Sequence, residues 1–288
     1  MRYLPIAAFL GLSLLWGSEW MLTTSLPRQP HLRALALQYA IAAGLLLPWA
    51  IHRRLWRQPL RSLVHVVIVG IGMLCLPQIL IFMSNGRLPP AVSLVALAAV
   101  PVWLAVGGRL MITPAVCGLA GVLFLAEQGL DIPVHQSLWL LLPLAATCLL
   151  AWALACAEKV MQEMSIAEAL FGQCAVCALS LWIASRLLER EALTWSATSV
   201  MGFAAAAALM VVCGYLLFYW LLSKFGAGRV STLQWTQPFV ATVESMALMA
   251  IRPGWALISG GILIVIATVW VFSNRDEAGG VLFEITRR

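Results

Sequence analysis

The stretch QWTQPFVATVE, Gln234 to Glu244, lies inside a run from Val230 to Ile251 that is otherwise apolar enough to cross a membrane. A membrane helix needs about 20 mostly apolar residues. Two glutamines, a proline and a carboxylate are costly in lipid, because lipid offers polar groups no hydrogen-bond partner. The run therefore predicts a membrane helix with one face turned toward a protected interior.

The rest of the chain has the same apolar character. Of its 288 residues, 62% are hydrophobic and 10% are charged, whereas a soluble domain is about half apolar and a quarter charged. Pro, Gly and Arg separate the apolar runs. The sequence predicts an all-α polytopic membrane protein with ten transmembrane helices, near residues 4–25, 33–51, 63–84, 91–108, 113–130, 138–157, 166–185, 199–222, 230–251 and 254–273.

The charges predict orientation and not a nucleic-acid partner. The net charge is +6, but the 18 Lys and Arg are scattered through short connections. With the N-terminus inside, twelve of these 18 fall on the cytoplasmic side. Because cytoplasmic loops are enriched in Lys and Arg, we expect both termini to be cytoplasmic.

Other kinds of site are not indicated. All seven cysteines fall in apolar runs, including the Cys174 and Cys177 pair, which indicates packing and not a disulfide framework or redox site. The four histidines lack metal-ligand spacing, and neither a P-loop nor a nucleophile–base–carboxylate set is present. We expect no enzyme activity, no metal and no cofactor.

An internal repeat is visible at an offset of 135 to 138 residues. Five spans per copy is an odd number, so the second copy enters the membrane from the opposite side, and such inverted repeats are typical of secondary transporters. We expect two inverted five-helix repeats, residues 1–132 and 133–275, around a central cavity, followed by a cytoplasmic tail, 276–288. The matched pairs are Trp16 with Trp152, Gln38 with Gln173, Cys75 with Cys213, and Pro101 with Pro238.

Three motifs resemble a known family. They are WGS at 16–18, NGRLPPAVSLVALAAVP at 85–101, and KFGAGRVSTLQWTQPF at 224–239. They resemble the EamA-type repeat of the drug/metabolite transporter superfamily, and within it the YddG-type amino acid exporters. The resemblance implies ten helices in the bacterial inner membrane and a cavity that moves small metabolites. The Gly-Glu pair that commonly ends spans four and nine is absent here, where GlyGlyArg (107–109) and IleArgPro (251–253) stand.

The candidate substrate-binding residues are polar or aromatic groups within the spans. On an α-helix, Gln234, Gln237, Ala241 and Glu244 fall within about 80° of one another. Glu19 is predicted at the same depth as Glu244. Each group also has an alternative role. The glutamines can form hydrogen bonds with neighbouring helices, and the carboxylates can reach lipid headgroups or arginines. Many of the tryptophans are expected at the membrane interface. The full candidate set is Trp16, Glu19, Gln38, Gln78, Phe82, Trp152, Tyr215, Tyr219, Gln234, Trp235, Gln237 and Glu244.

Amides, hydroxyls and aromatic walls suit an amino acid, whose ammonium also favours a cation–π contact. We therefore predict a secondary transporter that exports small metabolites by alternating access, and amino acids are the substrate class we favour. The alternative is an exporter of organic cations that uses Glu19 and Glu244. A membrane receptor or enzyme is a third class. Phosphorylated substrates are disfavoured, because the Lys and Arg lie at span ends or in loops. The expected partners are the substrate and the lipid bilayer.

Overall fold

The computed structural model of the protein describes residues 4–19, 29–53, 58–85, 87–127, 134–248 and 254–274. Within these ranges the regular elements are all helices. The expected repeat boundary at 132 and the tail 276–288 lie outside the described residues. The helices are α1 (Leu4–Gly17), α3 (His31–His52), α4 (Leu60–Val69), η2 (Gly70–Cys75), α5 (Leu76–Asn85), α6 (Pro90–Leu97), α7 (Val100–Val106), α8 (Ile112–Ala126), η4 (Val134–Leu140), α9 (Leu141–Glu163), α10 (Ile166–Leu188), α11 (Ala197–Ala205), η5 (Ala206–Cys213), α12 (Gly214–Val230), α13 (Leu233–Leu248) and α14 (Trp255–Ser273).

Six of the described helical stretches are long and apolar enough to cross a membrane. They are His31–His52, Leu60–Asn85, Gln136–Glu163, Ile166–Leu188, Ala197–Val230 and Trp255–Ser273. The other four expected spans contain shorter described helices, namely α1, α6 with α7, α8, and α13. The protein is therefore a multi-pass membrane protein, and the count of ten spans remains a proposal.

The fourth expected span, 91–108, is interrupted. Its helix stops after Leu97 and restarts at Val100, so α6 and α7 replace one continuous helix. Pro101 explains the break, because proline lacks an N–H for the carbonyl four residues earlier and its ring clashes there, whereas it is tolerated in a first turn. Pro238, at the matched position of the second half, lies inside α13 without such an interruption.

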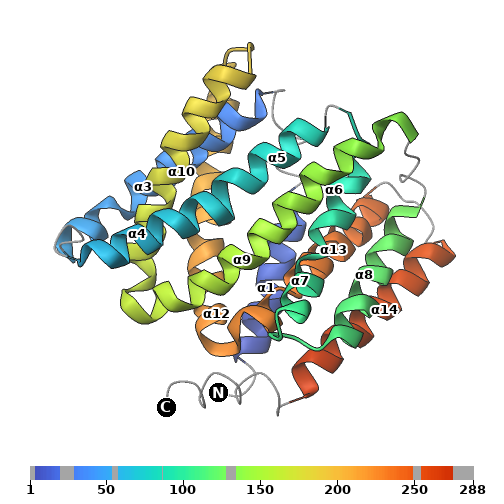
Figure 1. The fold of residues 1–288 in the computed structure, drawn as a ribbon. Coiled ribbons are helices and arrows are strands. Elements are labelled where there is room, and N and C mark those ends of the chain that lie inside the picture. The colour runs from blue at the N-terminus through green and yellow to red at the C-terminus, as the bar shows by residue number, and fades with distance from the viewer. Residues whose placement is uncertain are drawn as a thin grey trace.

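Two helix pairs flank the bundle and join its halves. The most extensive contacts are those of α3 with α10 and of α8 with α14, at opposite flanks of the bundle (Figure 1). In the proposed repeat each pair consists of matched helices, the second with the seventh and the fifth with the tenth. α1, α5, α9, α12 and α13 lie between the two pairs (Figure 1).

The long helices around the centre share an unusual turn. η2 is a π-helical segment that ends at Cys75, and η5 is a π-helical segment that ends at Cys213. These cysteines are a matched pair of the proposed repeat, 138 residues apart. π-Helical turns are rare and often occur at functional sites. Their occurrence at matched positions supports the internal repeat.

The α8–α14 contact depends on glycine. A Cβ added at Gly260 would lie 2.6 Å from the Gly121 carbonyl oxygen, and one at Gly121 would lie 2.8 Å from that of Gly260. The two backbones therefore touch, as small residues permit in membrane helices.

Gly260→Val should destabilise the protein by about 1–3 kcal/mol, because overpacking must push these two backbones apart. Gly44→Val is the matched control, since a Cβ at Gly44, also within an apolar helix, has nothing within 4 Å. Thermal unfolding in detergent measures both. Equal melting temperatures for the two variants would contradict the close contact.

Candidate functional site

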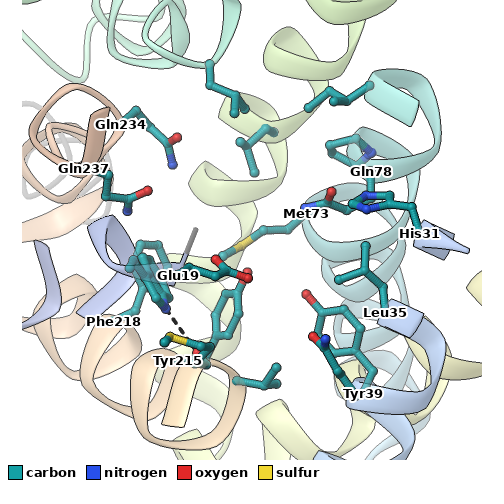
Figure 2. Close-up of a pocket in the computed structure, with 18 of the residues that line it drawn as sticks. Glu19, His31, Leu35, Tyr39, Met73, Gln78, Tyr215, Phe218, Gln234 and Gln237 are labelled. Atoms are coloured by element: carbon teal, nitrogen blue, oxygen red, sulfur yellow. Dashed lines mark hydrogen bonds between the residues drawn. The ribbon is translucent and has the colours of Figure 1, made fainter. Parts of the chain in front are cut away.

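A cavity of about 290 Å³ lies at the centre of the bundle (Figure 2). Both halves of the chain line it, so a ligand there would contact both. The first half contributes Trp16, Glu19, His31, Leu35, Gln38, Tyr39, Met73, Pro77, Gln78, Ile81, Asn85 and Leu97, and the second half contributes Leu150, Leu154, Met210, Val211, Tyr215, Phe218, Gln234 and Gln237.

The cavity extends to one end of the bundle. His31 begins α3 and Asn85 ends α5, and both residues line it. These helix ends lie opposite the end where α1 begins and α14 finishes (Figure 1). We call the former the mouth end and the latter the terminal end.

Aromatic rings form one wall. The Trp16 ring lies 5.0 Å from Tyr215 and 5.4 Å from Phe218, measured between ring centroids. The Trp16 indole Nε1 donates to the Met210 carbonyl oxygen at 3.0 Å, within the π-helical segment η5. Gly214 makes room for this ring, because a Cβ there would lie 2.5 Å from Nε1. The hydrogen bond and the close fit fix the ring against the cavity.

The polar groups of the cavity carry one formal negative charge. Glu19 is the carboxylate among the described lining residues, and these include no Lys or Arg. In Figure 2, Glu19 lies between Gln234 and Gln237 on one side and Gln78 and His31 on the other. A carboxylate with no cationic partner among the described lining residues attracts a positively charged ligand group.

Gln237 provides a free donor. Its Nε2 atom is buried and has no hydrogen-bond partner among the described residues. A buried amide without a partner costs free energy, so it favours a ligand that brings an acceptor.

A side arm of about 280 Å³ extends from the same residues. It shares Trp16, Glu19, Leu97, Gln234 and Gln237 with the main cavity. Its remaining lining is Gly17, Leu94, Pro238 and Ala241, which is apolar or small. The site therefore combines a polar junction at Glu19 with an apolar extension.

Residues 137–273 match the model of the EamA-like transporter family. The second half of the chain is therefore similar to EamA-like transporters. No curated protein matches the sequence.

One solved crystal structure resembles the whole bundle. Its TM-score is 0.77, and the alignment covers 93% of this chain and 97% of that chain at 18% sequence identity. At this identity the likeness shows the fold alone. The shared fold therefore extends over both halves of the chain and beyond residues 137–273.

Seven of the twelve predicted site residues line the cavity. They are Trp16, Glu19, Gln38, Gln78, Tyr215, Gln234 and Gln237. Ala241 of the predicted stripe lines the side arm. Three of the seven, Tyr215, Gln234 and Gln237, lie in the residues 137–273 that match the EamA-like family.

Two further predicted residues form a second layer. The Tyr219 hydroxyl donates to Gln173 Oε1, and its ring lies 6.2 Å from that of Tyr215. The Phe82 ring stacks on the His31 ring at 6.1 Å. Both support lining residues without lining the cavity.

Trp235 and Trp152 lie away from the cavity. Trp235 is fully buried, packs over Gly118 of α8, and donates from Nε1 to Thr268 Oγ1 at 3.0 Å. Trp235 directly follows Gln234, so its side chain points about 100° around the helix from that of Gln234, toward α8 and away from the cavity. The Trp152 residue, on α9, is 52% exposed.

Glu244 lies beyond the cavity on α13. Its Oε1 accepts from Ser18 Oγ at 2.6 Å, and its buried Oε2 has no partner among the described residues. α1 and α13 are neighbours, as a Glu19–Glu244 pair would require. However, Glu19 lines the cavity and Glu244 contacts Ser18, and no hydrogen bond between the two carboxyl groups occurs in the described part of the chain.

Some lining residues did not stand out in the sequence. His31 has no metal-ligand spacing to the other histidines, yet it lines the cavity with Leu35, Gln38 and Tyr39. Their spacing of four, seven and eight residues places all four on one helix face. That spacing, with Gln38 already chosen, could have identified the others.

Proposed function

We propose that this protein is a secondary transporter that exports amino acids and related small metabolites by alternating access. In this proposal ten spans form two inverted five-helix repeats in the bacterial inner membrane, with both termini in the cytoplasm. The YddG-type exporters are the relatives that the sequence motifs resemble. The observation that supports it best is a cavity shared by both halves, with one carboxylate, several amides and no described Lys or Arg.

Each chemical part of an amino acid has a counterpart in this cavity. Its ammonium lies near Glu19 and over the Trp16 ring, where a charge pair and a cation–π contact both favour it. Its carboxylate accepts hydrogen bonds from side-chain amides such as Gln237 Nε2. Its side chain occupies the apolar part of the site. A phosphorylated ligand lacks this match, because phosphate requires cationic partners.

An exporter of organic cations is the second candidate. Glu19 beside Trp16 and Tyr215 specifically favours it, because a carboxylate and an aromatic wall also hold a cation that has no carboxylate of its own. A non-transporting receptor or enzyme would bind ligand in the same cavity without moving it.

Counterflow of radiolabelled amino acids tests the proposal. The purified protein is reconstituted in liposomes preloaded with one amino acid, at equal pH on both sides. We expect uptake with the unmodified protein and loss of most uptake in Trp16→Ala and Gln237→Ala, which remove a cavity wall and an amide donor. Trp152→Ala is the matched control, since that half-exposed tryptophan lies outside the cavity.

Absence of uptake across a broad panel of amino acids would refute the amino acid proposal. The same liposomes, preloaded with organic cations, would then test the second candidate. Absence of counterflow for both classes would leave the receptor and the enzyme.

A further inference from the structure

A cluster of polar contacts closes the terminal end of the bundle. The Arg109 guanidinium forms an ion pair with Glu158 Oε2, and Glu158 Oε1 accepts a hydrogen bond from the Ala227 backbone N–H. Arg109 lies between α7 and α8, Glu158 lies on α9, and Ala227 lies near the end of α12. One carboxylate thus ties the first half of the chain to two segments of the second. We call Arg109, Glu158, Ala227 and Gly228 the terminal lock.

The backbone around Ala227 has a geometry that only glycine adopts readily. Gly226 has φ 76° and ψ 168°, which directs the Ala227 N–H toward Glu158. A Cβ at Gly226 would lie 3.0 Å from Glu158 Oε1. A Cβ at Gly228 would overlap the Arg109 carbonyl oxygen. The 107–111 and 226–229 segments therefore meet backbone to backbone.

Further contacts extend this closure to the last helix. Arg229 Nη2 donates to the Asn274 carbonyl oxygen at 2.8 Å, and Asn274 Nδ2 lies 3.4 Å from Met111 Sδ. Behind the lock, Val230, Ser231 and Leu233 are at most 1% exposed. The terminal end is therefore packed and bonded, whereas the cavity extends to the mouth end.

We propose that the terminal lock is a gate, and that Glu158 is the positioning residue whose release lets the cavity open at the terminal end. This inference rests on the proposed alternating access, because such a cycle must break whatever closes one end. Glu158 suits the role because both of its oxygens are engaged, so its departure frees the 107–111 and 226–229 segments together. Charge-assisted hydrogen bonds of this kind are stronger than neutral ones, yet both side chains keep some solvent contact, 27% for Arg109 and 20% for Glu158.

Cysteine accessibility tests the gate without any substrate. In a cysteine-free background in nanodiscs, where reagent reaches both ends, one reporter is Ser231→Cys behind the lock and the other is Gln78→Cys in the cavity wall. We expect fast maleimide labelling at 78 and slow labelling at 231. Glu158→Ala should raise the rate at 231 by about tenfold or more, and lower the rate at 78.

Two variants refine the test. Glu158→Gln should give labelling rates between those of the unmodified protein and Glu158→Ala. Its amide oxygen still accepts the hydrogen bond from the Ala227 N–H, but the ion pair with Arg109 is lost. Glu163→Gln is the matched control: Glu163 is on the same helix, is similarly exposed at 28%, and pairs with His65. It should leave both labelling rates unchanged.

The opposite changes at the two reporters separate a gate from general loosening. Faster labelling at both positions in Glu158→Ala, or no change at either, would overturn the gate. If the cysteine-free protein does not fold, hydrogen exchange of the native-cysteine protein gives the same comparison. Residues 226–232 should then exchange faster in Glu158→Ala and residues 76–85 more slowly. A switching gate without counterflow of any substrate would refute the proposed function and leave the gate standing.

Discussion

Glu19→Gln should weaken the binding of an organic cation by about 10- to 100-fold, the effect of losing a charged hydrogen-bond partner. Glu19 carries the formal charge of the described cavity lining, and a glutamine of equal size removes that charge without emptying the site. The affinity for a zwitterionic amino acid should fall less, because the ligand's own carboxylate offsets part of its positive charge. Ligand binding in nanodiscs, measured for both classes, gives the ratio of the two losses.

Glu244→Gln is the control for this experiment, because Glu244 lies outside the cavity and contacts Ser18. It should change the affinity for neither class. A similar loss in both variants would contradict the assignment of Glu19 as the cation contact. The ratio also separates the two proposed functions, since an organic-cation exporter depends on this charge far more than an amino acid exporter does.

Trp235→Ala should destabilise the protein by about 3–5 kcal/mol, as expected for a large side chain removed from a packed interior. The Trp235 ring is fully buried between α13, Gly118 of α8 and Thr268 of α14. The cavity left behind would sit where α13 joins the α8–α14 pair. Thermal unfolding in detergent measures the loss.

Trp152→Ala and Trp16→Ala complete the comparison. Trp152 is 52% exposed, so its removal should cost less than about 1 kcal/mol. Trp16→Ala should reduce counterflow more than stability, because that ring faces the cavity. A Trp235→Ala protein that is as stable as the unmodified protein but prefers other substrates would instead show that Trp235 contributes to substrate binding.

The sequence predicted the membrane class from composition, and the structure agrees within the described residues. Each described helix overlaps a span expected from hydropathy, because a backbone in lipid must satisfy its hydrogen bonds internally. It did not locate the interruption at Ala98 and Ala99, since Pro101 breaks its helix while Pro238 does not break α13. A proline stands at both matched positions, so its presence alone does not determine where a helix is interrupted.

The candidate site was partly predictable for the same reason. Gln234 and Gln237 are polar at helical spacing, so a protected face was required, and both line the cavity. Trp235 has no such constraint, because an indole is stable in a packed core, in a cavity wall or at an interface. Periodicity defines faces but does not say which face meets which neighbour.

Matched positions of the proposed repeat show this limit most clearly. Gln38 lines the cavity, whereas its counterpart Gln173 is buried against Tyr219. Trp16 faces the cavity, whereas its counterpart Trp152 is half exposed. The sequence by itself determined a membrane-embedded helical bundle with polar groups that need an interior. Only the tertiary structure decided which of those groups share one cavity and which pack against other helices, because that depends on contacts between segments far apart in the chain.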